Sequence, residues 1–285
     1  MTLRILFAGL ALLSAAPGAV QAQTPSPAVA APAQIATTHL TVPAPDGRTI
    51  DMSVWTAPDE KGVVVFSHGW GGGPAGYDRI FSAWAAHGFT VIAPLHVDSQ
   101  QHPRHADYDH RQVFLTRIMD LYVARGLAHE THPGKPLIVA GHSFGSLMSM
   151  MEAGAVTVAG PLGDPDVRGV ISFSSTGELP TVIRDTTWDG LNRPLLMITG
   201  QGDGTADGDW TIHRVPYDRS PAGDKTLMVF TGADHELVAN ASDDQFALLV
   251  EATEDFLDAY ALNDAAAKAR LNALPSSDAV NIERR

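Results

Sequence analysis

Residues 137–145, Leu-Ile-Val-Ala-Gly-His-Ser-Phe-Gly, place the tightest constraint on the fold of this chain. Four apolar residues lead directly into the pattern G-x-S-x-G around Ser143, and a segment rich in small residues and methionine (146–155) follows. That order predicts a buried strand, a sharp turn and a helix. Such a turn lifts the serine hydroxyl clear of the sheet. Glycine is expected at 141 and 145 because a Cβ there would collide with the neighbouring helix and strand.

The rest of the chain predicts strands that alternate with helices. Two alternating segments, 38–42 and 49–55, flank a Pro-Asp-Gly-Arg turn and predict a hairpin. Further strands are expected at 62–66, 89–95, 136–140, 170–173, 194–199 and 226–230, and helices at 77–87, at 113–127 and through the apolar positions 246–260. This alternation predicts an α/β fold with a mostly parallel central sheet and helices on both faces.

The N-terminus has the pattern of an export signal. Arg4 supplies a positive charge, residues 5–13 are apolar, and Val20-Gln-Ala22 provides a cleavage site before Gln23. The apolar stretch is too short to span a bilayer, which argues against a membrane anchor. We therefore expect residues 1–22 to be a removed signal peptide and the mature protein to be secreted or periplasmic.

Three further segments complete the expected domain organisation. Residues 23–36 are rich in Pro and Ala and predict an unstructured linker. The catalytic domain is expected to cover 37–264, and residues 265–285 to form a frayed C-terminal tail. No stretch after the signal is long and apolar enough to predict stable membrane insertion.

Charge and cysteine content exclude several classes of protein. The chain has 19 Lys and Arg against 32 Asp and Glu, a formal net charge of −13, which argues against nucleic acids and anionic membranes as partners. It contains no cysteine, which excludes disulfides, thiolate metal sites and a cysteine nucleophile.

Two later strand ends carry the partners that a nucleophilic serine needs. A histidine must take the proton of the serine hydroxyl, and a carboxylate must fix the tautomer of that histidine. Asp203 follows the strand 194–199, and His235 follows the strand 226–230. The order Ser143, Asp203, His235 is the one expected for a serine carried on a strand-to-helix turn. The sequence therefore predicts these three residues as a catalytic triad.

The choice of acid has alternatives. Asp207 and Asp209 follow the same strand as Asp203. We favour Asp203 because it lies nearest to the strand end. Each of the two residues also has a simpler, non-catalytic interpretation. Asp203 would then be an ordinary turn residue, and His235 a solvated loop histidine.

An oxyanion hole requires backbone N–H donors aimed at the developing negative oxygen. One is expected from Phe144, directly after the nucleophile, and the other from Trp70, in the His-Gly-Trp-Gly loop after the strand 62–66. Glycines 71–73 allow the backbone to approach a substrate closely. They do not predict a phosphate loop, because no Gly-Lys-Ser/Thr follows them.

A polar loop follows the strand 89–95. It contains seven histidines and aspartates: His96, Asp98, His102, His105, Asp107, Asp109 and His110. Imidazoles and carboxylates are metal ligands, but no histidine pair on a convincing helix supports a metal, and serine acyl transfer requires none. We expect a solvated loop, with no metal and no other cofactor. His96, Asp98 and His142, together with Trp70, are expected to shape the substrate site.

These motifs together resemble the α/β-hydrolases. The matching segments are His68-Gly-Trp-Gly71, Gly141-His-Ser-Phe-Gly145, Gly200-Gln-Gly-Asp203 and Asp234-His235, which span most of the domain. The chain is most similar to the compact branch that contains dienelactone hydrolase-like, chlorophyllase-like, platelet-activating-factor acetylhydrolase-like and polyester hydrolases. The resemblance implies an α/β-hydrolase fold. A lid in such proteins normally follows the strand 170–173; residues 176–193 are too few for a cap domain, so we expect an open site.

Differences between this chain and particular branches of the family narrow the range of reactions to be expected. Dienelactone hydrolases have cysteine where this chain has Ser143, which favours serine ester hydrolysis here. Secreted polyester hydrolases often carry a C-terminal disulfide, which this chain lacks. An aspartate at the same position would have indicated a dehalogenase or epoxide hydrolase, and there is no room for the extra domain of prolyl peptidases.

The sequence thus predicts a secreted serine hydrolase that cleaves a small-molecule or polymeric carboxylic ester through an acyl-enzyme. Thioesterase, perhydrolase and polyester hydrolase activities would use the same residues. The alternative from another class is a catalytically idle binding protein on the same scaffold.

Overall fold

The computed structural model describes residues 35–204 and 209–285. The predicted signal peptide (1–22), nearly all of the predicted linker and Asp207 lie outside the described residues. Residues Gln34–Arg285 form one compact unit.

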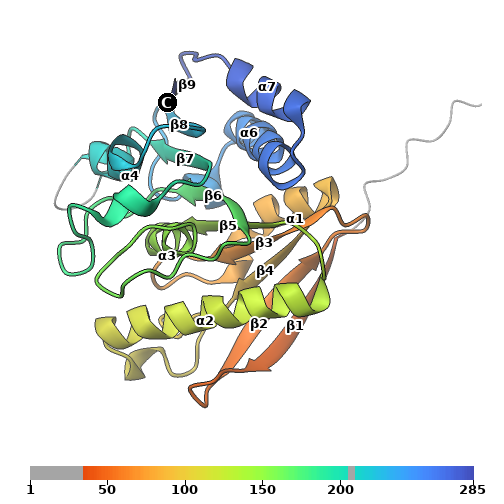
Figure 1. Cartoon of the computed structure of the whole chain (residues 1–285), viewed down its shortest axis with the longest axis vertical. Coiled ribbons are helices and arrows are strands. Elements are labelled where there is room, and N and C mark those ends of the chain that lie inside the picture. Colours follow the sequence, from red (N-terminus) through yellow and green to blue (C-terminus); the bar gives the residue numbers. More distant parts are fainter. Residues whose placement is uncertain (1–34, 205–208) are drawn as a thin grey trace, which may run out of the picture. The chain divides into compact units, whose positions relative to one another are not determined.

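A nine-stranded sheet runs through this unit in the order β1-β2-β4-β3-β5-β6-β7-β8-β9 (Figure 1). Six central strands, from β4 to β8 in that order, are parallel, whereas β1, β2 and β9 pair antiparallel at the two edges. The strands are β1 Ala36–Pro43, β2 Thr49–Thr56, β3 Gly62–Ser67, β4 Phe89–Pro94, β5 Leu137–His142, β6 Val167–Phe173, β7 Leu195–Gly200, β8 Lys225–Phe230 and β9 Val280–Arg284. The mostly parallel sheet that the sequence predicts is therefore present.

Helices cover both faces of the sheet. Alternate residues of β3 show this, because Val63 and Val65 pack in one apolar core with α2 and α3, whereas Val64 and Phe66 pack in another with α1 and α6. The helices are α1 Asp78–His87, α2 His110–Thr131, α3 Phe144–Glu152, α4 Val215–Arg219, α5 Leu237–Asn240, α6 Asp243–Ala261 and α7 Ala265–Ala273, with short 3-10 turns η1 Pro74–Tyr77, η2 His105–Asp107, η3 Thr187–Gly190 and η4 Trp210–Arg214. Within the described chain, no helix has the length and apolar character needed to cross a membrane.

Helix α2 begins earlier than its apolar periodicity predicts. The Asp109 side chain accepts the Gln112 N–H, and the Gln112 side chain accepts the Asp109 N–H, both at 2.8 Å. This capping box satisfies free N–H groups of the first turn and starts the helix at His110. Asp109, one of the possible metal ligands of the polar loop, is thus occupied as a helix cap.

The C-terminal segment is folded, which corrects the expected frayed tail over 265–285. Asp264 caps α7, and β9 pairs with β8 along its whole length. Arg284 also donates to the carbonyls of Leu271 and Leu274 at 3.0 and 2.7 Å. The apolar signal of this segment is weak, because α7 buries only two side chains and β9 is short and mostly polar.

Candidate active site

Ser143 lies on a strained turn between β5 and α3. Its backbone has φ 53° and ψ −123°, a conformation that costs free energy and persists where the surroundings enforce it. A Cβ at Gly141 would lie 2.3 Å from the Gly145 carbonyl oxygen, and one at Gly145 would lie 2.0 Å from the Ser67 carbonyl oxygen. Both glycines are therefore required sterically, by helix α3 and strand β3 respectively, as the motif predicts.

Asp203 and His235 meet at the ends of β7 and β8. Asp203 Oδ1 lies 2.7 Å from His235 Nδ1, and Asp203 Oδ2 accepts the Thr199 hydroxyl at 2.7 Å. A carboxylate only accepts hydrogen bonds, so His235 donates from Nδ1, and Nε2 is the ring nitrogen placed to take a proton. Burial opposes the charge on Asp203, but hydrogen bonds from His213, His235 and Thr199 hold its pKa well below the usual value.

The nucleophile and base are not yet hydrogen-bonded to each other in this conformation of the described residues. His235 has a side-chain exposure of 37%, whereas Asp203 is fully buried. Hydrogen bonds between such groups often tighten only when substrate binds. Asp203 is therefore fixed by its buried surroundings, whereas the side chain of His235 is more exposed.

The buried ring of His142 is hydrogen-bonded to the backbone of His235. Its Nε2–H donates to the His235 carbonyl at 2.7 Å, and its Nδ1 accepts the Tyr77 hydroxyl at 2.9 Å. Burial, and then the nearby His235, lower the pKa of His142 to about 4, so the ring is neutral at pH 7 and can play both roles. His142 is 2% exposed and is not among the residues that line the cleft, so it contacts the base and not the space for a substrate.

The loop from residue 69 to 72 leaves one N–H group free. Gly69 N–H donates to the Tyr77 hydroxyl at 3.0 Å, Gly71 N–H to Asp98 at 2.9 Å and Gly72 N–H to the Gly69 carbonyl at 3.1 Å. The Trp70 N–H has no acceptor among the described residues. Phe144 is the first residue of α3, where an N–H has no acceptor within the helix. These are the two N–H groups that the sequence predicts as oxyanion donors.

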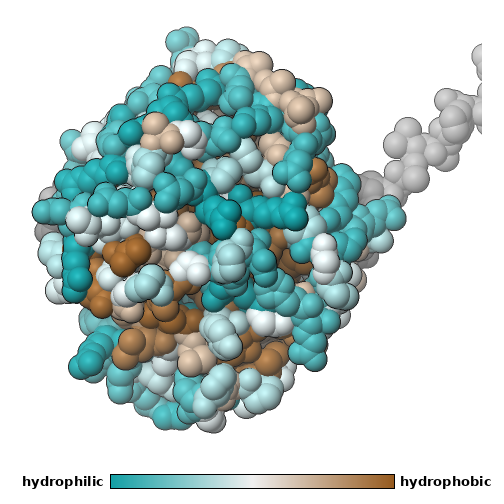
Figure 2. Space-filling model, viewed as in Figure 1, coloured by the Kyte–Doolittle hydropathy of each residue, from teal (hydrophilic) through white to brown (hydrophobic). Residues whose placement is uncertain are grey.

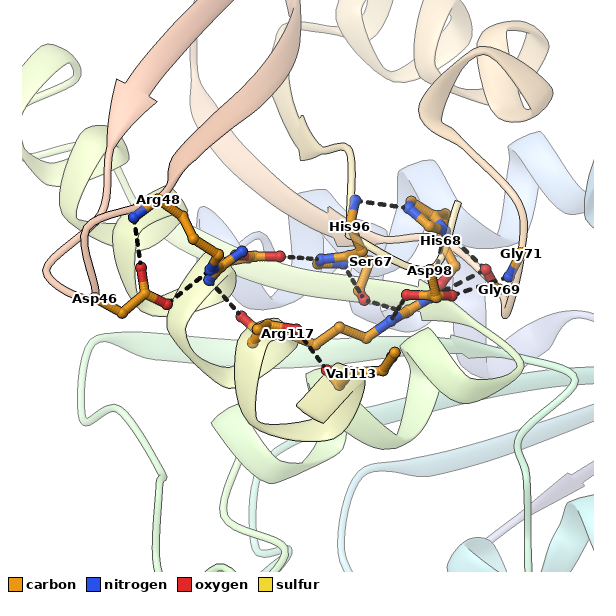
Figure 3. A network of polar contacts seen from close by, with 12 residues as sticks. Asp46, Arg48, Ser67, His68, Gly69, Gly71, His96, Asp98, Val113 and Arg117 are labelled. Carbon is orange, nitrogen blue, oxygen red and sulfur yellow. Dashed lines mark hydrogen bonds and ion pairs between the residues drawn. The ribbon is translucent and has the colours of Figure 1, made fainter. Parts of the chain in front are cut away.

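A buried arginine on α2 holds this loop in place (Figure 3). Arg117 binds Asp98 through Nε and Nη2, at 2.8 and 2.7 Å, and donates to the carbonyls of His68 and Gly69 at 2.6 and 3.1 Å. Burial opposes the charge on Asp98, but Arg117 holds its pKa well below the usual value. Both side chains are thus charged, and together they fix the backbone on each side of Trp70.

His96 belongs to the same buried network and lies away from the cleft. Its Nε2 contacts the Ser67 hydroxyl and its Nδ1 contacts Asp120, both at 2.9 Å. Asp120 in turn accepts from Arg48 at 2.8 Å. His96 has no exposed surface and is not among the residues lining the cleft, so the substrate contact predicted for it has no counterpart in this arrangement.

An apolar cleft of about 860 Å³ opens above Ser143. Figure 2 shows apolar residues gathered on the face that carries α2 and the loops beside α3. Trp70 stands in the cleft wall with 46% of its surface exposed and stacks on His110, with ring centroids 4.9 Å apart. The lining residues are Trp70, His110, Arg111, Phe114, Leu115, Ser143, Phe144, Val158, Ala159, Thr176, Leu179, Thr181 and Val182. The segment between β6 and β7 forms only the turn η3, so this segment provides no cap domain over the cleft.

Groups that could hold a metal lie elsewhere than the polar loop predicted as a possible metal site. Among the described residues, three sets bring three candidate ligand atoms within 4.8 Å of one another, and none includes a residue of the loop 96–110. One set is Asp203, His213 and His235. In this set, the Asp203 carboxylate is already occupied by its contacts with the two histidine rings.

Sequence reasoning missed three residues that support the site: Arg117, Tyr77 and His213. Arg117 had a detectable signal, since it stands between Val113 and Leu121 on the buried face of α2, where a charge is rarely found without a partner. Tyr77 and His213 had no comparable signal, because their roles depend on contacts across the sheet. Asp98 was expected near the substrate pocket, but its pairing with Arg117 was not predicted.

Comparison with known proteins bears on the fold and the family of the chain. A family model described as the alpha/beta hydrolase family matches residues 64–280. Among solved structures, the esterase domain of a Rhodothermus marinus protein is similar, with a TM-score of 0.58 and 15% sequence identity over 80% of this chain and 100% of that one. At this identity the likeness concerns the fold. No curated protein matches the chain.

Proposed function

The chain belongs to the alpha/beta hydrolase family, and from that premise we propose that it is a serine hydrolase that cleaves carboxylic esters through an acyl-enzyme. The observation that carries the proposal is the pairing of Asp203 with His235 at 2.7 Å, at the same end of the sheet as the strained Ser143 turn. A binding protein that does no chemistry would have no need for that pairing together with a strained serine.

In the first half of the reaction, Ser143 Oγ attacks the ester carbonyl carbon and its proton passes to His235 Nε2. The Trp70 and Phe144 N–H groups donate to the oxygen that becomes negative. When the tetrahedral intermediate collapses, the C–O bond to the alcohol breaks, and His235 gives its proton to the leaving alkoxide. Asp203 stays ionised and stabilises the imidazolium.

In the second half, water replaces the alcohol. His235 takes a proton from the water as the water oxygen attacks the acyl carbon of the Ser143 ester. The Trp70 and Phe144 N–H groups bind the second oxyanion. Collapse returns the proton to Ser143 Oγ and releases the carboxylic acid. The two halves therefore use one base and one oxyanion hole.

The cleft favours esters with an apolar group. Its wall is mostly apolar, and the segment between β6 and β7 forms no cap domain over it. Burial of apolar surface contributes about 0.8 kcal/mol per CH₂, so turnover should improve with acyl length until the cleft is filled. Thioesters would enter the same site, and a direct comparison of oxygen and sulfur leaving groups separates ester from thioester preference.

We also propose that the protein is exported, on the basis of the charged, apolar and small-residue pattern of residues 1–22. Sequencing the N-terminus of the protein recovered outside the cytoplasm should give Gln23 as the first residue. An uncleaved chain retained in the cytoplasm would refute the export proposal.

The test of the activity is a kinetic series on purified protein with p-nitrophenyl acetate, butyrate and octanoate and with matched thioesters. We expect kcat/KM to rise from acetate to the longer esters and the ester to exceed its thioester. Failure to turn over any member of the series would refute the proposed function.

A further inference from the structure

A second histidine contacts the acid of the proposed triad. His213, on η4, is 1% exposed, and its Nε2 lies 2.9 Å from Asp203 Oδ1 and 2.7 Å from the Asp203 carbonyl oxygen. On the other side of the ring, Nδ1 contacts the carbonyl oxygen of Ser175. Asp203 Oδ1 is therefore shared between the rings of His213 and His235.

All three partners of the His213 ring are hydrogen-bond acceptors. A neutral imidazole has one N–H and one lone pair, so it can satisfy acceptors at only one nitrogen, whereas an imidazolium donates from both. A lone pair directed at the Ser175 or Asp203 oxygen inside a buried site would leave two acceptors facing each other, which is costly. The contacts require a donor at each nitrogen of His213.

We propose that His213 is an imidazolium at neutral pH and that it is a positioning residue, which holds the Asp203 carboxylate in the orientation that His235 needs. The inference rests on the proposed function for its catalytic part and on hydrogen-bond chemistry alone for the protonation of His213.

The charged surroundings of the ring support this assignment. Asp203 at the end of β7 is the one carboxylate that contacts it among the described residues, and the other titratable rings nearby are His235 after β8, 5.8 Å away between centroids, and the neutral His142 at the end of β5. Asp209, the N-cap of η4, accepts from the Thr211 N–H, and Arg214, the last residue of η4, pairs with Asp218 and Glu283. Burial by itself disfavours a charged ring, but the bonds to Asp203 and to the Ser175 carbonyl outweigh it and raise the pKa of His213.

The same ring ties the acid to the wall of the cleft. Ser175 directly precedes Thr176, which lines the cleft, and η4 packs so closely on this loop that a Cβ at Gly177 would lie 1.8 Å from the Ile212 carbonyl oxygen. His213 thus bridges the end of β7 and the loop after β6. Loss of one ring proton would release one of these two attachments.

The protonation is tested by NMR of protein labelled with ¹⁵N at histidine, over pH 6 to 10. We expect the His213 resonances to show both ring nitrogens protonated at pH 7.5 and to titrate only at higher pH. His213→Gln should remove these signals, and His129→Gln, an exposed histidine on α2, should leave them. Through-bond correlations in the wild type give the assignment if His213→Gln does not fold. A His213 ring with a single N–H at pH 7.5 would overturn the proposal.

The positioning role is tested by the kinetics of the same two variants. We expect His213→Gln to lower kcat roughly 10- to 100-fold with KM within about twofold, because the loss falls on a step after binding. The wild type should lose kcat on the alkaline side as His213 titrates, and His213→Gln should lack that limb. Unchanged kcat in the variant would overturn the role. If neither the wild type nor the variants hydrolyse esters, the proposed function fails. The NMR result still decides whether both ring nitrogens of His213 are protonated.

Discussion

Arg117 and Asp98 form a buried ion pair held by two hydrogen bonds. Oδ2 of Asp98 also binds the backbone of the loop 69–72, which contains the Trp70 N–H. Arg117 Nη2 donates to Asp98 Oδ2 at 2.7 Å, and the same oxygen accepts the Gly71 N–H at 2.9 Å. Through this shared oxygen, helix α2 fixes the position of a loop that is distant in sequence (Figure 3). The position of the Trp70 N–H is thus set by a charge pair that does not itself reach the cleft.

Asp98→Asn should weaken catalysis more than binding. The amide keeps the shape of the carboxylate but can no longer accept from both Arg117 and Gly71 with the same strength, so the Trp70 N–H is less well aimed. We expect kcat to fall about 10- to 100-fold, less than the 10²- to 10³-fold loss of a whole oxyanion donor, with KM nearly unchanged. Asp107→Asn, in the exposed pair with Arg104, is the matched control and should change neither constant. Equal kcat in both variants would contradict the role of the pair.

The strands and the order of the proposed triad could be predicted from local pattern. Buried parallel strands are continuous apolar runs, so β3 to β8 stand out in the sequence, and the Ser143 turn is marked by its two glycines. Residues after parallel strands gather at one edge of a sheet, so the sequence predicts that Asp203 and His235 lie together.

What could not be predicted depends on contacts between distant segments. His142 directly precedes Ser143 and His96 follows a parallel strand, yet both rings lie in buried networks rather than in the cleft. His213 reaches Asp203 from a turn ten residues later, at no recognisable spacing. The folded C-terminus was missed because edge strand β9 has too few apolar residues to show a pattern.

Asp203→Asn tests the choice of acid. The buried carboxylate fixes the His235 tautomer, so its loss should lower kcat by about 10³- to 10⁴-fold. Asp209 is exposed and accepts the Thr211 N–H as the cap of η4, so Asp209→Asn should change kcat less than about tenfold by the same measure. Steady-state kinetics on p-nitrophenyl butyrate decide between them. A crippled Asp209→Asn and a nearly normal Asp203→Asn would move the acid to the other residue.

Trp70→Ala should separate the two roles of this position. The substitution removes the exposed indole but keeps the backbone N–H, so binding of apolar acyl chains should weaken while the oxyanion hole remains. We expect KM for the octanoate ester to rise about tenfold, as a loss of roughly 1.4 kcal/mol of apolar contact implies, with a smaller change for the acetate ester. A fall in kcat for both esters without a change in KM would contradict this division.

Glu152→Gln should change how stability depends on pH. Glu152 is buried at the end of α3 beside Arg125, and burial, against the effect of Arg125, raises the pKa of Glu152 to about 7. The folded protein then binds more protons here than the unfolded chain, so the free energy of unfolding should fall as pH rises from about 4.5 to 7. Urea unfolding across this range should show a flatter profile for Glu152→Gln, and Glu130→Gln, exposed on α2, should match the wild type. Identical profiles for all three proteins would contradict the raised pKa.

The most direct measurement of the central claim is ester hydrolysis by Ser143→Ala beside the wild type, with circular dichroism as the control for folding. We expect a folded variant whose kcat is lower by about 10⁴- to 10⁶-fold. A fluorophosphonate should label the wild type on Ser143, as located by mass spectrometry, and leave the variant unlabelled. Turnover by folded Ser143→Ala within tenfold of the wild type would contradict the account.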